Sequence, residues 1–290
     1  MLWNEAQLLE EFGAEGYEWF VAKVTPRLAA CVYCHGTNIM TLPNDVLNEA
    51  WAKEGKTTNF TKTEACKVCY DYVSRVTAFV KLWVNTVPPA YRKFTLRTLQ
   101  PKEGLAVSIE RQREVMEAVR NDPNRGYAFF GPPQAGKTVM TTALYTEALW
   151  NETVRAPQYD LKAQKYFPVW RISTKKMLDE HTDWTMHRND PEPEFGVGIL
   201  QPTVTVEKIA HVRKYNRTPR LFLEEIDKVK ETDARRHNLF EILNAIHDYQ
   251  GVLVVSSNYD RVEFAHRLGD DLAWRIKESC KIADLFSEKV

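Results

Sequence analysis

One short stretch, residues 127–138, constrains the fold of this chain more than any other. It reads Tyr-Ala-Phe-Phe-Gly-Pro-Pro-Gln-Ala-Gly-Lys-Thr, so that an apolar run leads into two glycines, a lysine and a threonine. The spacing fits G-x-x-x-x-G-K-[ST], the phosphate-binding loop that joins a strand to a helix. The flanks agree, because residues 127–130 have the pattern of a buried strand and residues 139–150 carry apolar side chains at helical spacing.

This loop predicts ATP and Mg²⁺ as ligands. Its glycines let the backbone N–H groups converge on an anion, and the following helix points its positive end at the same anion. We expect Lys137 to reach the β- and γ-phosphates and the Thr138 hydroxyl to bind magnesium. Gln134 replaces a glycine that many such loops carry, which predicts a slightly stiffer loop. The residues expected to line the nucleotide are Gly131, Pro132, Pro133, Gln134, Ala135, Gly136, Lys137, Thr138 and Val139.

The composition is that of an ordinary globular protein. The formal net charge of the 290 residues is +0 and 44% are hydrophobic, so any contact with nucleic acid must come from a local patch. A chain of this length favours two domains. No segment has the apolar length of a membrane span and the start lacks a signal-peptide pattern, so we expect a cytoplasmic protein with no membrane partner.

Two C-x-x-C pairs near the start predict a zinc site. Cys31 and Cys34 form the first pair, and Cys66 and Cys69 form the second. Four thiolates suit tetrahedral Zn²⁺, although the 31 residues between the pairs exceed the usual ribbon spacing and predict a helix around residues 45–53. His35 is an alternative ligand for one cysteine. A redox pair and four metal-free buried cysteines are the competing explanations.

The periodicity predicts a helical N-terminal region followed by an α/β domain. The prolines around residues 87–101 interrupt the helical pattern, so we place a zinc-binding, partner-docking domain at residues 1–95 and an ATPase domain at 96–290. Alternating strands and helices imply a parallel sheet covered by helices on both faces, with the ligand at the carboxyl ends of the strands. We expect strands at 127–130, 167–174, 220–227, 251–258 and 281–286. We expect helices at 4–24, broken near Gly13 or Gly16, and at 70–85, 107–119, 139–150, 175–180, 204–215, 234–249 and 260–278, with a loop at 181–203.

Carboxylates follow the third of these strands. Glu224 is expected to hold the water shell of magnesium, and Glu225 is expected to act as the catalytic base that orients or deprotonates the attacking water. Aspartate is commoner at the first position, so the longer Glu224 predicts weaker metal coordination and slow hydrolysis. Asp227 lies further along the chain and is the less favoured base.

Two later polar residues complete the predicted constellation. Asn258 ends the next strand, where its amide is placed to position water or touch the γ-phosphate, or simply to cap a turn. Arg275 follows one helix later and occupies the position of an arginine finger that serves a neighbouring subunit, a role that requires self-association. As a lone residue, Arg275 would be a surface arginine paired with Asp270 or Asp271.

The order of these segments resembles the AAA+ ATPase core. Within it, the Val-Pro-Pro-Ala-Tyr-Arg-Lys-Phe-Thr-Leu run at 87–96 and the Ser-Ser-Asn-Tyr run at 256–259 are similar to the bacterial replicative helicase loaders (the DnaC/DnaI group) and the related IstB-type transposition ATPases. The resemblance covers roughly residues 87–286. The chain departs from the family in one respect: it stops soon after the fifth expected strand, so we expect the small C-terminal helical lid of many AAA+ proteins to be absent or vestigial. This departure favours a nucleotide switch over a continuously working motor.

The resemblance implies an ATP-dependent helicase loader. ATP would lie between subunits, the N-terminal domain would hold a replicative helicase hexamer, and the ATPase domain would grip single-stranded DNA. Trp170, Trp184 and Tyr215 are candidates for stacking on bases, with core packing as the simpler role for each. The alternatives are an IstB-like regulator of transposition on duplex DNA, a zinc-dependent nucleic-acid-binding scaffold with a structural ATP site, and a small-molecule kinase, which Asn258 and Arg275 disfavour.

Overall fold

The computed structural model describes residues 5–31, 39–43, 53, 61–105, 107–155, 167–187, 201–228 and 232–286. The chain forms two compact units, Met1–Lys93 and Phe94–Val290. The functions expected of the two domains remain predictions.

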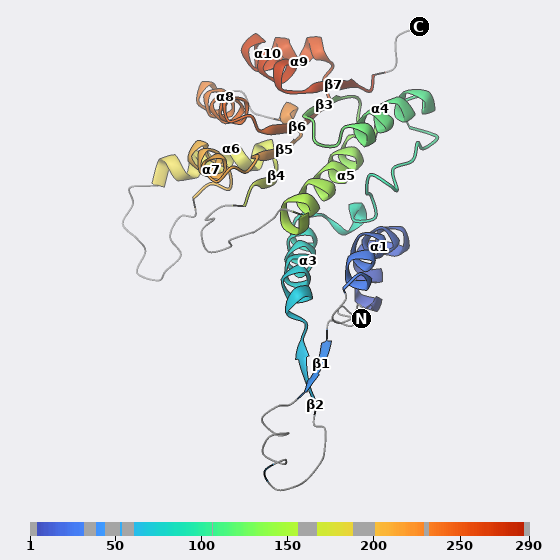
Figure 1. The fold of residues 1–290 in the computed structure, drawn as a ribbon. Helices are drawn as coiled ribbons and strands as arrows, with labels where there is room; N and C mark the ends of the chain where they lie inside the picture. The colour runs from blue at the N-terminus through green and yellow to red at the C-terminus, as the bar shows by residue number, and fades with distance from the viewer. Residues whose placement is uncertain are drawn as a thin grey trace. The chain divides into compact units, whose positions relative to one another are not determined.

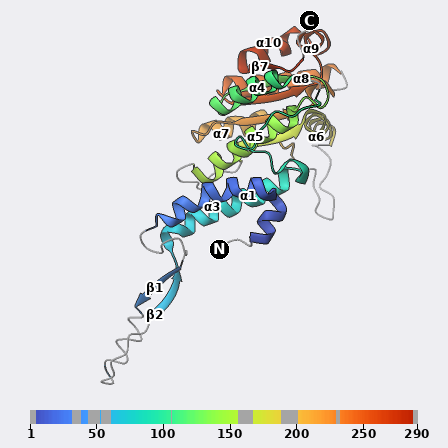
Figure 2. The ribbon, with the colours of Figure 1, turned by 90° about the vertical axis from the view of Figure 1, so that its right-hand side faces the viewer.

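Within the described residues, the main elements of the first unit are the helices α1 and α3 and an antiparallel pair of strands, β1 and β2 (Figures 1 and 2). Helix α1 (Glu5–Ala29) bends at Gly13, where φ is 67°, which confirms the predicted break. Strands β1 (Ile39–Pro43) and β2 (Thr61–Ala65) pair antiparallel, and α3 (Lys67–Thr86) follows directly. The hairpin was not predicted, and of the helix expected at residues 45–53 only Lys53 lies within the described residues.

Aromatic side chains hold α1 against α3. Phe12 stacks on Trp83 with ring centroids 4.0 Å apart, and Trp19 meets Phe79 at 6.2 Å. Beyond α3, the buried Arg92 donates from Nε to the Val87 carbonyl and from Nη2 to the Val84 carbonyl, both at 2.8 Å. These bonds satisfy carbonyls at the helix end, where the prolines stop the helix and a 3₁₀ turn (Pro89–Tyr91) begins.

The second unit is built on a five-stranded parallel sheet of order β4-β5-β6-β3-β7. This confirms the predicted α/β class. The strands are β3 (Tyr127–Phe130), β4 (Val169–Ser173), β5 (Arg220–Glu224), β6 (Val252–Ser257) and β7 (Lys281–Asp284).

Helices cover both faces of the sheet, as predicted. Successive strand residues point to opposite faces, so Phe222 packs edge-on against Tyr145 of α5 at 5.3 Å, while its neighbours Leu221 and Leu223 join the core under the later helices. In Figure 1 the strands lie between the green helices and the yellow-to-red ones. The first face has α4 (Ile109–Asn121), α5 (Lys137–Trp150) and its π-helical extension (Asn151–Arg155); the second has α6 (Thr174–His187), α7 (Val206–Lys214), α8 (Asp233–Asp248), α9 (Arg261–Leu268) and α10 (Asp270–Ser279).

Several predicted boundaries are wrong; the first helix, for example, runs to Ala29 instead of residue 24. The third strand ends at Glu224 instead of residue 227, because Glu225 adopts a left-handed φ of 56° and a 3₁₀ turn (Ile226–Lys228) follows. The helix expected at 260–278 is two helices, divided at Gly269 with a φ of 93°.

Helix α6 is longer than predicted, since it continues to His187 into the region expected to be a loop. Glu180 accepts hydrogen bonds from the N–H and hydroxyl of Thr203, and His181 Nε2 lies 2.7 Å from the Val204 carbonyl. These contacts with a distant segment stabilise the extra turns, and local periodicity carries no sign of them. Residues 188–200 of the expected loop lie outside the described part of the chain.

Candidate nucleotide site and cysteine cluster

The phosphate-loop motif forms a tight turn at the carboxyl end of β3. Its curvature uses left-handed conformations at Gln134 (φ 65°) and Gly136 (φ 87°), and the Ala135 N–H donates to the Pro132 carbonyl at 3.2 Å. Gly136 immediately precedes α5, so the first turn of that helix consists of Lys137, Thr138 and Val139. The turn therefore brings the N-terminus of α5 to the sheet edge where the ligand was expected.

The first glycine of the motif is required by packing. A Cβ at Gly131 would lie 2.7 Å from the Leu285 Cβ, closer than real Cβ contacts allow, and a tight 3.2 Å from the Ala135 Cβ. The Gly131 N–H donates to the Ser257 carbonyl, and the Leu285 N–H donates to the Phe130 carbonyl at 2.6 Å. The segment after β7 thus closes against the base of the loop.

Lys137 is held by three oxygen acceptors. Its Nζ donates to the carbonyls of Gly131 and Pro132 at 2.6 and 2.7 Å and to Asn258 Oδ1 at 2.9 Å. Burial lowers the pKa of Lys137 to about 8, and the nearby carboxylates of Asp227 and Glu225 offset part of that shift. The structure therefore brings together the predicted lysine and the predicted asparagine, 121 residues apart in sequence.

Asp227 fixes the orientation of Asn258. One carboxylate oxygen accepts from the Asn258 backbone N–H at 3.0 Å, and the other accepts from its Nδ2 at 2.9 Å. With Nδ2 engaged by a carboxylate, Oδ1 is left to face Lys137. The sequence analysis considered Asp227 only as a less favoured candidate for the base. Asp227 and Asn258 each follow one of two strands that are adjacent in the sheet, and this placement is the signal that would have pointed to their contact.

Glu224 is paired with an arginine that the sequence analysis did not select. Arg171 of β4 donates from Nε and Nη2 to one oxygen of Glu224, Oε1, at 3.1 and 2.7 Å. The hydroxyl of Thr174 donates to the Glu224 backbone carbonyl at 3.0 Å. The predicted magnesium partner thus carries a permanent cation beside it.

Glu225 is the most exposed of the three carboxylates. Its side chain is 48% accessible and accepts from Lys228 Nζ at 2.5 Å, a hydrogen bond that raises the pKa of Lys228. Its backbone N–H donates to the Ser256 hydroxyl at 3.2 Å. A half-exposed carboxylate beside the loop has the access to solvent that a water-activating base requires, and its catalytic role remains a prediction.

Arg275 is not brought to the loop within this chain. It lies on α10, where Nη1 is 3.5 Å from Glu278 Oε2 and the guanidinium lies 4.8 Å from the Trp274 ring centroid. Its Nε has no hydrogen-bond partner among the described residues. A role toward a second subunit remains a prediction.

The aromatics proposed to stack on bases have different environments. Trp170 is 7% exposed and belongs to the sheet core, which makes core packing its role in this structure. Trp184 is partly buried on α6, and Tyr215 is 43% exposed with its ring 4.9 Å from His211.

Among the described helices, none has the length and apolarity needed to cross a membrane.

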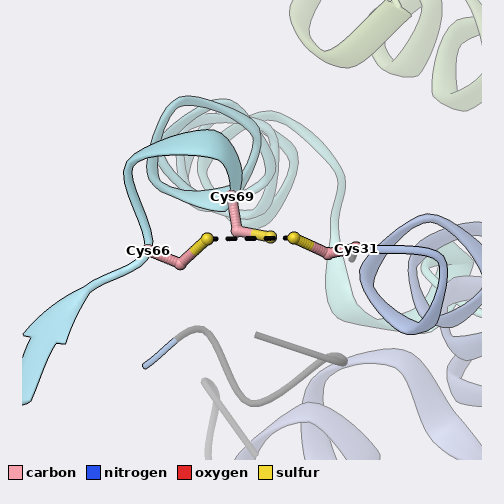
Figure 3. Close-up of side chains that lie close together, drawn as sticks. All are labelled: Cys31, Cys66 and Cys69. Atoms are coloured by element: carbon pink, nitrogen blue, oxygen red, sulfur yellow. Dashed lines mark hydrogen bonds between the residues drawn. The ribbon is translucent and has the colours of Figure 1, made fainter. Parts of the chain in front are cut away.

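In the first unit, three of the four predicted zinc ligands converge (Figure 3). The Sγ atoms of Cys31, Cys66 and Cys69 all lie within 4.8 Å of one another, and all three residues are buried. Cys66 and Cys69 share one turn, because the Cys69 N–H donates to the Cys66 carbonyl at 3.1 Å. Cys34 and His35 lie outside the described residues.

The spacing of these sulfurs fits a metal. Tetrahedral Zn²⁺ with Zn–S bonds of about 2.3 Å places its sulfurs roughly 3.8 Å apart. Cys31 and Cys66 Sγ are separated by 3.8 Å, well beyond a disulfide bond. Three buried thiols that lie this close together are compatible with a small zinc site.

No family model and no curated protein matches this chain. Among solved structures, similar ones include the DnaC helicase loader, with 17% identity, a TM-score of 0.47, and coverage of 68% of this chain and 98% of that one. DnaI has 12% sequence identity and a TM-score of 0.47, and the match covers 69% of this chain and 94% of the DnaI chain. DnaA from Aquifex aeolicus bound to AMPPCP has 15% sequence identity and a TM-score of 0.44. The match covers 67% of this chain but only 49% of the DnaA chain. At these values the likeness concerns fold alone: the chain is similar to DnaC, DnaI and DnaA in its P-loop α/β architecture.

Proposed function

We propose that this protein is an ATP-dependent switch that loads a replicative helicase onto single-stranded DNA. The observation that carries the ATP-binding part is the convergence of Gly131, Pro132 and Asn258 oxygens on the buried Lys137 ammonium. A buried cation whose acceptors are neutral oxygens gains strongly when an anion replaces them. The triphosphate of ATP is such an anion, and the N-terminus of α5 adds its dipole.

In this proposal Lys137 exchanges its carbonyl partners for the β- and γ-phosphates. Asn258, fixed by Asp227, keeps its Oδ1 directed at the Lys137 ammonium and is available to accept a hydrogen bond from the attacking water. Glu225 orients and deprotonates that water. Thr138 and Glu224 fit a Mg²⁺ ion, whose charge would neutralise the phosphates when bound.

A nucleotide-binding assay tests the ATP site. A fluorescent ATP analogue should bind the wild-type chain, and Lys137→Ala should weaken binding at least about a hundredfold, because a buried phosphate partner is lost. Lys175→Ala, which removes an exposed lysine on α6, is the matched control and should bind as wild type does. Equal binding by both variants would refute the ATP site.

The loader part of the proposal rests on the motif resemblance, and its test needs a partner. The full chain is mixed with a replicative helicase hexamer, and light scattering is recorded with and without ATP and single-stranded DNA. A complex whose stability changes with ATP, and no longer does so in Lys137→Ala, supports loading. ATP-driven assembly on duplex DNA without helicase would support the transposition alternative instead.

We also propose that Cys31, Cys66 and Cys69 bind zinc, with Cys34 as the fourth ligand. The sulfur spacing supports this assignment. Zinc would fasten the end of α1 to the start of α3, where the hairpin emerges, and so rigidify the unit expected to dock on the helicase. Metal content measured by mass spectrometry tests the site directly.

The scaffold alternative draws on one specific observation, the neutralisation of Glu224 by Arg171. A weak metal site would suit a protein that binds ATP without turning it over. Measurable hydrolysis that is lost in Glu225→Gln while ATP binding persists would exclude the scaffold.

A further inference from the structure

The Arg171–Glu224 pair includes the carboxylate that is expected to hold the water shell of magnesium. The Arg171 side chain is only 4% exposed, and its guanidinium lies 5.6 Å from the Tyr145 ring centroid on α5. Two of its nitrogens donate to Glu224, while Nη1 has no hydrogen-bond partner among the described residues. Burial on this scale means that the guanidinium cannot swing into solvent to vacate the site.

Strand register explains why residue 224 is a glutamate. Ser173 pairs with Glu224 and Arg171 pairs with Phe222, so Arg171 and Glu224 share a face of the sheet but are offset by two residues. A carboxylate at position 224 must therefore reach back along the strand to touch the guanidinium. The additional methylene of glutamate, relative to the commoner aspartate, supplies that reach.

The two oxygens of Glu224 have different environments. Oε1 accepts both hydrogen bonds from Arg171, whereas Oε2 accepts none from the described residues, and the side chain is 24% exposed. A hydrated cation thus still has one oxygen available. A cation bound to that oxygen would lie only several ångströms from the positively charged guanidinium. The repulsion between these two charges weakens cation binding by about tenfold at the permittivity of a wet site.

We propose that Arg171 is a positioning residue that holds Glu224 and lowers the affinity of the nucleotide site for its divalent cation. The inference rests on the proposed nucleotide site and names how that site is regulated: nucleotide binds first, and the cation joins weakly, so occupancy of the metal follows its free concentration. Arg171 does this through Glu224, without contacting the phosphates.

The test measures metal binding directly. Mn²⁺ is titrated into the full chain saturated with ADP, and free Mn²⁺ is followed by electron paramagnetic resonance. Arg171→Met should bind Mn²⁺ about tenfold more tightly than wild type, and Arg171→Lys should be intermediate. Arg235→Met, which breaks the partly exposed pair with Asp179 in the same unit, is the matched control and should match wild type.

A second variant guards against misfolding of the first. Glu224→Asp shortens the side chain, withdraws the carboxylate from Arg171, and should also tighten Mn²⁺ binding. Unchanged Mn²⁺ affinity in a folded Arg171→Met, or a loss of metal-free ADP affinity that shows Arg171 touching phosphate, would overturn the inference. If the wild-type chain bound no ADP at all, the proposed function would fail first.

Discussion

The two units of this protein assemble their candidate sites in opposite ways. In the first, three soft thiols from the end of α1 and the start of α3 gather in a buried cluster, against which the partly buried Leu28 packs. In the second, hydrogen bonds already link Lys137 to Asn258 and Asn258 to Asp227, and a separate pair of bonds links Arg171 to Glu224. If the first site binds zinc as proposed, the metal completes it, whereas the side chains of the second are organised before any ligand arrives.

The largest effect is expected when the first unit loses its metal. Cys66→Ser should abolish zinc binding and unfold this unit, because structural zinc contributes on the order of 10 kcal/mol. Hydrogen exchange should rise in α1 and α3 and stay unchanged in β3 and α5. Cys280→Ser, which replaces a buried cysteine of the second unit, should leave the metal content intact. If α1 and α3 stayed protected from hydrogen exchange after the metal was lost, the proposed difference between the two sites would be wrong.

The next prediction concerns the preorganised site. Glu225→Gln should lower ATP turnover by roughly a hundredfold or more, since an amide cannot accept the proton of the attacking water. ATP affinity should hold within about twofold. Glu110→Gln, on the exposed side of α4, provides the control. Full turnover in Glu225→Gln would assign the base elsewhere.

Asp227→Asn should lower kcat by roughly tenfold with little change in KM for ATP. The substitution removes one of the two acceptors that orient Asn258, and a charge-assisted hydrogen bond of this kind contributes about 1.5–3 kcal/mol. The pH profile should move as well, because Asp227 raises the pKa of Lys137. A pure stability defect, with kcat unaltered in the folded fraction, would show that the pair is structural only.

The smallest expected effect is on pH dependence. With its pKa lowered to about 8, Lys137 is charged below pH 8 and becomes neutral above it, so ADP affinity should fall by about tenfold between pH 7 and pH 9. Binding above pH 8 should take up a proton, which calorimetry in two buffers detects. The sign for the unliganded fold is reversed: because burial disfavours the charged form, stability rises as pH increases from about 8 toward 10.5. A flat affinity profile would mean that the lysine is solvated.

Much of the second unit could be predicted from local sequence. The phosphate loop, the strand–helix alternation and the residues facing Lys137 all follow from spacing and apolar periodicity. The contacts that tune the site could not, because Arg171 meets Glu224 across 53 residues and Asp227 meets Asn258 across 31. Such pairs depend on strand order and register, which one sequence does not reveal. The break at Gly269 was missed because helical periodicity continues on both sides of it.

The packing of Leu285 against Gly131 has a consequence for the order of folding. The residue after β7 fills the space behind the phosphate loop and donates to the last carbonyl of β3. On the ribosome the loop is made about 150 residues before the segment that braces it. The motif is therefore complete in sequence well before it can be supported in space, and the packing behind the loop is acquired in a single late step.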